Sequence, residues 1–130
     1  MNTLGSLRYP LLLAGISLLL ASIAHASARE YLFKDQQICD SQGAFCMRGT
    51  LYYKSNSRLL HLRGRVQVAP GSGLLIIRLA GTNELGHQRY APFEVQVRGN
   101  NSEIINHKMI PDYPDVQSWS VQRVSFVPDE

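Results

Sequence analysis

Apolar and polar residues alternate with a period of two along most of the chain after residue 28. In the segment Leu60–Val68, leucines and valines fall on one face, while His61, Arg63, Arg65 and Gln67 fall on the other. Such alternation is typical of a β-strand with one face on a core and the other in water. We therefore expect His61, Arg63 and Arg65 to point towards solvent.

The same alternation, interrupted by turns rich in glycine, proline and asparagine, predicts about seven strands. They are expected at residues 31–34, 45–53, 59–68, 74–80, 90–98, 104–109 and 118–127. The segment 74–80 is apolar on both faces, which indicates a central strand. The segment 118–127 slips by one residue at Gln122-Arg123, as a β-bulge does. No segment after Ala28 has the 3.6-residue period of a helix.

This pattern predicts an all-β fold. About seven short strands in about 100 residues suit a small immunoglobulin-like β-sandwich of antiparallel strands. The likeness is one of architecture, because the sole tryptophan, Trp119, follows both cysteines instead of lying between them. A small β-barrel is the alternative, since alternation alone does not distinguish a barrel from a sandwich.

The first 28 residues have the three parts of a cleaved secretory signal peptide. Arg8 and the terminal amine form a positive region, residues 11–23 are uncharged and leucine-rich, and small residues predict cleavage after Ala26 or Ala28. The apolar stretch is shorter than the about 20 residues that a membrane-spanning helix needs. We therefore expect a periplasmic or secreted product in which residues 29–130 form a single domain with no stable membrane span. An uncleaved anchor is the alternative.

Cys39 and Cys46 are expected to form a disulfide, because an exported chain with an even number of cysteines enters an oxidising compartment. The residues between them, Asp-Ser-Gln-Gly-Ala-Phe, include turn formers that can close a hairpin. A redox-active pair is disfavoured, since the two cysteines do not form a Cys-x-x-Cys motif. Two unpaired thiols are the remaining alternative.

Composition and charge add information about the partner. The chain is 45% hydrophobic and 18% charged, with a formal net charge of +3, which is typical of a globular domain. Between Arg48 and Arg98 there are eight basic residues but only two acids, Glu84 and Glu94. This basic middle could face an acidic partner, an anionic lipid headgroup or a polysaccharide. Arginine is also an ordinary residue on the solvated face of a strand.

The sequence contains no pattern that indicates catalysis, a metal or a cofactor. His61, His87 and His107 match no metal-ligand spacing. The serine in Gly71-Ser72-Gly73 does not lie in the Gly-x-Ser-x-Gly elbow of a hydrolase. We therefore predict no catalytic residue, no bound metal and no cofactor, and the predicted export disfavours a nucleic-acid partner.

Two groups of residues are candidates for binding, one on the strands and one in a segment that two prolines stiffen. The candidates are His61, Arg63, Arg65 and Arg98 on the strands, and Ile110 and Tyr113 in the stiffened segment. The strand residues would form one surface only if their strands are neighbours. Exposed aromatic and aliphatic residues such as Ile110 and Tyr113 are common anchors at interfaces.

Together these observations favour an exported, non-enzymatic binding or assembly module of the cell envelope, whose partner is a protein or an anionic envelope component. A secreted inhibitor of a hydrolase is the alternative, because a rigid disulfide-bonded domain loses little entropy on binding. The basic middle of the chain argues against a basic target such as lysozyme. A small hydrolase or a metal-binding protein is the least favoured interpretation.

Overall fold

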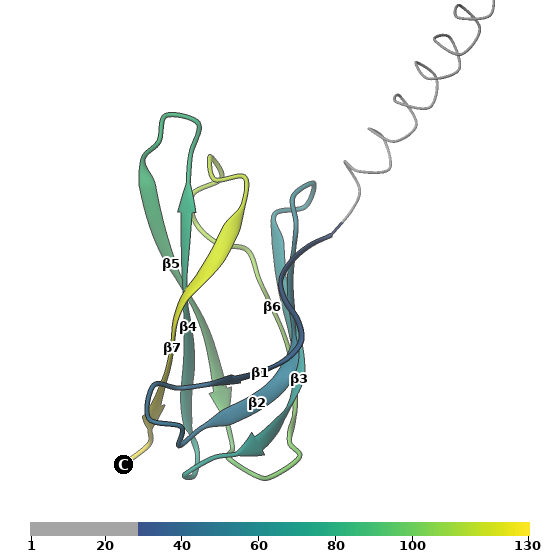
Figure 1. Cartoon of the computed structure of the whole chain (residues 1–130), viewed down its shortest axis with the longest axis vertical. Coiled ribbons are helices and arrows are strands. Elements are labelled where there is room, and N and C mark those ends of the chain that lie inside the picture. The colour runs from purple at the N-terminus through teal and green to yellow at the C-terminus, as the bar shows by residue number, and fades with distance from the viewer. Residues whose placement is uncertain (1–28) are drawn as a thin grey trace, which may run out of the picture.

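The computed structural model describes residues 29–130, which form seven antiparallel strands in two packed sheets (Figure 1). The strands are β1 (Glu30–Cys39), β2 (Cys46–Lys54), β3 (Leu59–Val68), β4 (Gly73–Thr82), β5 (Gln88–Val97), β6 (Ile104–Met109) and β7 (Trp119–Pro128). The predicted all-β sandwich is therefore confirmed. The predicted signal peptide lies outside the described residues. Within residues 29–130 there is no helix that is long and apolar enough to cross a membrane.

The strand order is β1-β2-β3-β6 in one sheet and β5-β4-β7 in the other. Neighbours in the chain form the hairpins β1–β2, β2–β3 and β4–β5, whereas the other three connections cross between the sheets. The immunoglobulin constant domain has the orders A-B-E-D and C-F-G. The present order is different, so the sandwich is supported without immunoglobulin-like connections.

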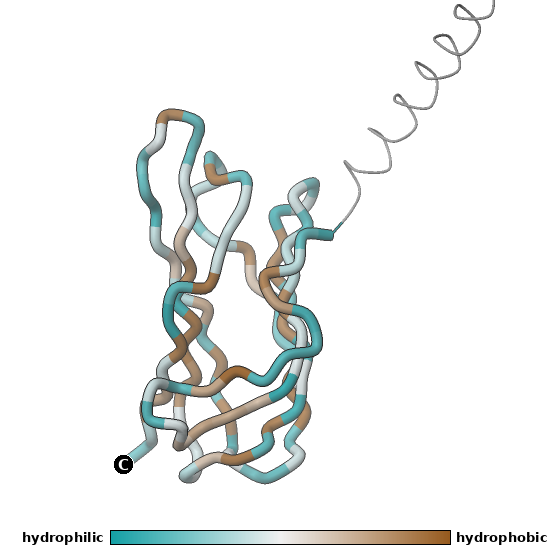
Figure 2. The backbone as a smooth tube through the Cα atoms, viewed as in Figure 1, coloured by the Kyte–Doolittle hydropathy of each residue, from teal (hydrophilic) through white to brown (hydrophobic). Residues whose placement is uncertain are grey.

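The core lies between the two sheets and is built from alternate residues of each strand. Leu75, Ile77 and Leu79 of β4 face Leu60 and Leu62 of β3 as fully buried side chains. Figure 2 shows hydrophobic positions along the strands, while hydrophilic positions gather in the turns and in the middle of β1. β4 lies between β5 and β7, which confirms the prediction of a central strand.

The disulfide between Cys39 and Cys46 is formed and closes the β1–β2 hairpin, as predicted. Asp40 organises the turn, because its side-chain oxygen accepts a hydrogen bond from the Phe45 backbone N–H at 2.9 Å. Gly43 adopts a left-handed φ of 73° in the same turn, a conformation that glycine adopts without strain. Local chemistry therefore fixes where β1 ends and β2 begins.

Two local irregularities decide how the outer strands run. In β7, Arg123 pairs with Arg78 while Val121 pairs with Leu79, so Gln122 is the extra residue of the predicted bulge. In β1, the register with β2 shifts on both sides of Phe33. The bulged β1 continues to residue 39, whereas the sequence predicted a strand that ends at residue 34.

Candidate functional site

The outer face of the four-stranded sheet gathers basic side chains from strands that are distant in sequence. Arg65 on β3 lies opposite Arg48 on β2 and Ile104 on β6. Arg63, two residues earlier on the same face, lies opposite Thr50 and Asn106. Because residues two apart in a strand share a face, these pairs form adjacent rows across the sheet.

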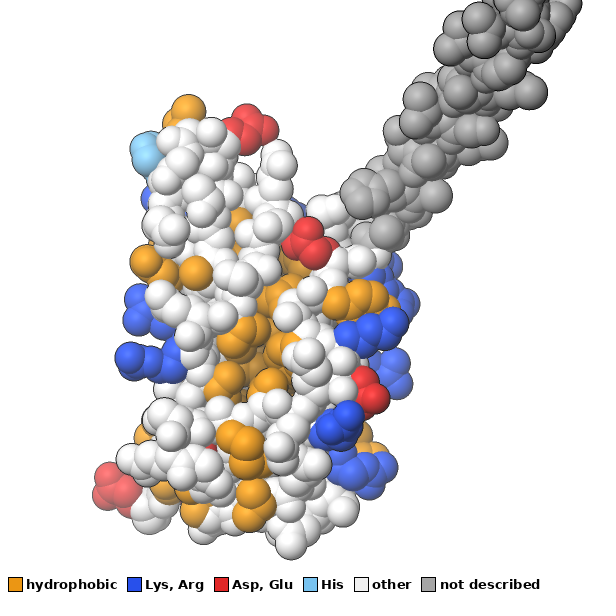
Figure 3. Space-filling view, viewed as in Figure 1, with side chains coloured by type: hydrophobic (Ala, Val, Ile, Leu, Met, Phe, Trp, Pro, Cys, Tyr) orange, Lys and Arg blue, Asp and Glu red, His pale blue; other side chains and the backbone are white. Residues whose placement is uncertain are grey.

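A shallow depression of about 570 Å³ opens on this face. Its lining residues are Arg29, Tyr31, Lys34, Arg48, Thr50, Tyr52, Arg63, Gly64, Arg65, Ile104, Ile105 and Asn106. Among these described residues five carry a positive charge and none carries a negative one. Figure 3 shows Lys and Arg side chains along the flank of the molecule formed by this sheet. We call this feature the basic depression.

The basic depression extends over a large part of the sheet. Its lining comes from β1, β2, β3 and β6 and from Arg29, which directly precedes β1. Neighbouring strands are about 4.8 Å apart, so four strands span about 14 Å. The backbone positions of its charged residues are therefore distributed over a surface.

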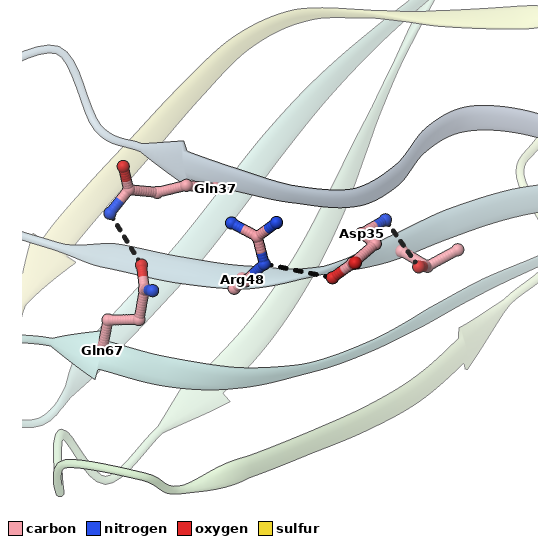
Figure 4. Close-up of polar contacts among 5 residues, drawn as sticks. Asp35, Gln37, Arg48 and Gln67 are labelled. Atoms are coloured by element: carbon pink, nitrogen blue, oxygen red, sulfur yellow. Dashed lines mark hydrogen bonds and ion pairs between the residues drawn. The ribbon is translucent and has the colours of Figure 1, made fainter.

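Hydrogen bonds hold one side of the basic depression in place. The Arg48 Nε donates to Asp35 Oδ1 at 3.1 Å, and the backbone N–H of Asp35 donates to Thr50 Oγ1 at 3.0 Å (Figure 4). Asp35 itself has a left-handed φ of 47° within the bulged part of β1. Next to this pair, the side-chain amide of Gln37 donates to Gln67 at 2.7 Å and so bridges β1 and β3 (Figure 4).

Two tyrosine rings position two further cations. The Arg29 guanidinium lies 4.6 Å from the centre of the Tyr52 ring, and the Lys34 ammonium lies 4.8 Å from the centre of the Tyr31 ring. The rings contact each other edge to face at 6.0 Å. Cation–π contacts of this kind contribute about 0.5–1 kcal/mol at exposed sites. The tyrosines thus restrict where Arg29 and Lys34 can place their charge.

His61 is buried, so the prediction that it points to solvent is wrong. Only 8% of its surface is exposed, although it lies on the outer face between Tyr52 and Lys108. Its Nδ1 lies 2.7 Å from the Tyr52 hydroxyl and its Nε2 lies 2.6 Å from Asn106 Oδ1. Because an amide oxygen only accepts, Nε2 carries the proton and Nδ1 accepts from Tyr52 in the neutral ring. His61 therefore supports two residues that line the basic depression.

Arg98 does not line the basic depression, unlike Arg63 and Arg65. It follows β5, where its backbone N–H donates to the Glu103 carboxylate at 3.1 Å. Arg98 lines a second hollow, formed by the 98–104 connection, which shares Ile104 with the basic depression. The Arg65 guanidinium donates to the Ser102 carbonyl of this connection at 3.3 Å. Arg78 lies on the outer face of the other sheet, opposite Arg123. Of the predicted strand residues, Arg63 and Arg65 therefore line the basic depression together, and His61 contacts two further residues of its lining, Tyr52 and Asn106.

Ile110 and Tyr113 lie on the connection between β6 and β7, outside the basic depression. They are 56% and 42% exposed, respectively. The Arg89 guanidinium lies 5.3 Å from the centre of the Tyr113 ring. The connection is tied to the β4–β5 turn by Asp115, which accepts a hydrogen bond from the Asn83 amide at 2.9 Å. This hydrogen bond, aided by nearby Arg89, lowers the pKa of the Asp115 carboxyl.

The histidines do not come together as a metal site. Within residues 29–130 no group of three histidine, cysteine or acidic side chains is placed to hold a metal ion. His107 packs edge to face against Phe93 at 5.5 Å, and His87 lies in the β4–β5 turn. A second buried titratable group, Tyr53, lies in the core, where desolvation raises the pKa of its hydroxyl above 10.0.

Several residues of the basic depression were not predicted from the sequence. Arg48, Thr50 and Tyr52 alternate along β2, and this pattern was available in the sequence. Arg29 and Lys34 carried no such signal, because the bulges in β1 break its alternation.

No protein-family model matches the chain, and comparisons with curated proteins and with solved structures give no significant match.

Proposed function

We propose that this protein is an exported, non-enzymatic binding module of the cell envelope that binds an anionic ligand in the basic depression. The observation that carries the proposal is the set of five cations around one depression without a carboxylate in its lining. Arginine is suited to this role, because its planar guanidinium forms paired hydrogen bonds with carboxylates and phosphates.

The lining also favours binding over catalysis. It contains arginine, lysine, tyrosine, threonine and asparagine side chains, but no histidine, cysteine or carboxylate. A nucleophile paired with a base, which covalent catalysis needs, has no obvious source among them. The depression is shallow and open, so a reacting group in it would remain in contact with water.

The predicted export adds a charge at the rim of the site. Cleavage after Ala28 makes Arg29 the first residue, and its new amine has an ordinary pKa of about 8. That amine would lie beside the Arg29 guanidinium, which already contacts Tyr52. Removal of the leader and completion of the binding surface would then be one event.

Two double variants test the role of the basic depression. Arg63→Gln/Arg65→Gln removes two charges from it, while Arg78→Gln/Arg123→Gln removes two charges from the outer face of the other sheet. The full chain is expressed, the exported product is purified, and its co-sedimentation with the cell-envelope fraction is measured at low and high salt. Two exposed charge contacts contribute about 1–2 kcal/mol together, so the first variant should bind about tenfold more weakly.

The control variant should bind as the parent does, and added salt should weaken the binding of the parent by screening. Equal loss in both variants would mean that net charge alone matters, and the proposal would be wrong. The mass of the exported product tests the first half of the proposal. A product that begins at residue 27 or 29 supports it, and a product that retains the leader contradicts it.

A further inference from the structure

We infer that the ligand of the basic depression is a linear acidic polysaccharide whose carboxylates repeat along the chain. This inference rests on the proposed function and specifies its ligand. Its first support is the distribution of charge: Lys34 lies on β1, Arg48 on β2 and Arg65 on β3. Strand spacing separates such positions by about 5 Å for neighbours and about 10 Å for β1 and β3. Their charged groups are held by different partners, Lys34 over the Tyr31 ring, Arg48 on Asp35 and Arg65 on the Ser102 carbonyl. A repeating polyanion can pair with several of them, whereas a single carboxylate pairs with fewer.

The second support is the presence of neutral hydrogen-bonding groups between the cations. Asn106 and Thr50 lie in the same row as Arg63. The Asn106 oxygen is occupied by the His61 ring at 2.6 Å, so its NH₂ group is left to donate. Sugars present hydroxyl oxygens between their charged groups, and these oxygens accept hydrogen bonds from such donors. His61 therefore acts as a positioning residue for Asn106.

The shape and polarity of the site argue against two other anionic partners. A surface that inserts into a bilayer presents several exposed apolar residues, whereas Ile104, 69% exposed, is the one strongly exposed aliphatic residue of this lining. A protein interface usually contains a buried aromatic or aliphatic anchor at its centre. The middle cross-strand row of this site consists of Thr50, Arg63 and Asn106, which are all polar. A flexible, polar and extended chain fits this surface better than either.

The test compares polymers that differ only in charge. Polygalacturonate carries one carboxylate per sugar, and its methyl ester keeps the same backbone without the charge. Titration calorimetry on the exported protein should detect binding to polygalacturonate and at least a tenfold weaker response to the ester. Affinity should also rise from the galacturonate monomer to a short oligomer, because the longer chain reaches several cations at once.

The variants connect this result to the residues. Arg63→Gln/Arg65→Gln should reduce the affinity for polygalacturonate about tenfold, and Arg78→Gln/Arg123→Gln should leave it unchanged. Asn106→Ala should weaken oligomer binding severalfold. Thermal unfolding of each variant shows whether it is folded, and a misfolded Asn106→Ala is replaced by Asn106→Ser.

Vesicles containing an anionic phospholipid and inorganic phosphate serve as further probes. If the protein binds envelope material and anionic vesicles but not polygalacturonate, the inference is wrong and the proposed function stands. If the monomer binds as tightly as the oligomer, the extended-chain part is wrong. If neither envelope material nor any anionic probe binds, both the inference and the proposed function are overturned.

Discussion

The hydrogen bonds that the buried His61 makes with Tyr52 and Asn106 give the sharpest prediction about stability. His61→Ala removes a ring that is 8% exposed and that contacts the Tyr52 hydroxyl at 2.7 Å and Asn106 at 2.6 Å. Tyr52 is itself 8% exposed, so its hydroxyl has little access to water. Asn106 is exposed and can turn to solvent.

The magnitude follows from these two partners. A buried polar group left without a partner costs about 1–3 kcal/mol, whereas the exposed Asn106 amide regains its hydrogen bond from water. We therefore expect His61→Ala to lower the free energy of unfolding by about 2 kcal/mol, mainly through Tyr52. For a domain of this size, that corresponds to a fall in Tm of roughly 8–16 °C.

A double-mutant cycle separates the hydrogen bond from the loss of packing. Tyr52→Phe should cost about 1 kcal/mol, since it leaves His61 Nδ1 unpaired. In His61→Ala/Tyr52→Phe neither partner remains, so the double variant should cost about 1 kcal/mol less than the sum of the single ones. Urea unfolding followed by circular dichroism and by Trp119 fluorescence measures all four proteins.

His87→Ala is the control, because His87 lies exposed in the β4–β5 turn. A surface substitution of this kind changes stability by about 0.5 kcal/mol or less. If His61→Ala is as mild as His87→Ala, His61 is solvent-exposed as its sequence pattern predicts. If the two single effects simply add, the hydrogen bond between His61 and Tyr52 is not formed.

Three further outcomes are expected. Cys39→Ala/Cys46→Ala should lower the free energy of unfolding by about 2.4 kcal/mol, which is the loop-entropy value for the sequence separation of 7. Chemical denaturation under non-reducing conditions measures this loss. A loss well above this value would show that the disulfide does more than close its loop. Gly49→Ala should destabilise the fold by about 1–3 kcal/mol, because the added methyl would overlap the Arg63 carbonyl oxygen and lie 2.8 Å from the Gly64 Cα. Thermal unfolding measures this effect, and an unchanged Tm would contradict the close approach of β2 and β3. Burial raises the pKa of Tyr53 above its ordinary 10.0, so the contribution of Tyr53 to stability is present below pH 10 and is lost as the pH rises from there through the folded pKa. Between pH 8 and 11, the free energy of unfolding should therefore fall more steeply for the parent than for Tyr53→Phe. Parallel curves for the two proteins would count against this pKa shift.

The strands were largely predictable because their signal is local. β3 and β6 have the predicted bounds, and the other strands except β1 differ by one or two residues at their ends. The bulge at Gln122 was also visible, since one extra residue shifts every later side chain to the other face. Alternation and turn chemistry are properties of neighbouring residues, so strands can be predicted from them without knowledge of the tertiary structure.

The site was predictable only in part because it depends on pairing between distant strands. The sequence placed Arg63 and Arg65 on an outer face, but it did not show that β6 pairs with β3 and brings Asn106 beside them. The prediction that His61 is exposed to solvent was wrong for the same reason. Alternation shows which face a residue lies on, whereas Tyr52 on the next strand decides whether water reaches it.

The second half of β1 was not predicted, because the strand contains a bulge at which Asp35 has a left-handed backbone conformation. Lys34, Asp35, Gln36 and Gln37 are consecutive polar residues, which ends an alternating pattern on paper. In the fold, Asp35 takes a left-handed φ, its N–H donates to Thr50, and its carboxylate accepts a hydrogen bond from Arg48. The strand continues past the bulge, and Lys34 in its first half lines the basic depression together with Arg29, which directly precedes the strand.

Both outer faces contain a pair of arginines in direct register, and their surroundings distinguish them. Arg48 faces Arg65 on the four-stranded sheet, and Arg78 faces Arg123 on the other. Like charges directly opposite each other destabilise a sheet by up to about 1 kcal/mol, so neither pair by itself identifies a site. Arg78 packs over Tyr90 in a hollow lined by apolar residues such as Pro92.

Charged residues such as these are mostly found on the solvated surface of a protein. The pair Arg48 and Arg65, in contrast, is joined by three more cations, by oriented amide and hydroxyl groups, and by a carboxylate that restrains Arg48 from outside the depression. Arg63→Gln/Arg65→Gln and Arg78→Gln/Arg123→Gln each remove two positive charges, and each breaks one of these facing arginine pairs. A difference in binding between the two double variants must therefore come from the surroundings of the charges, which is the property that separates a built site from a solvated surface.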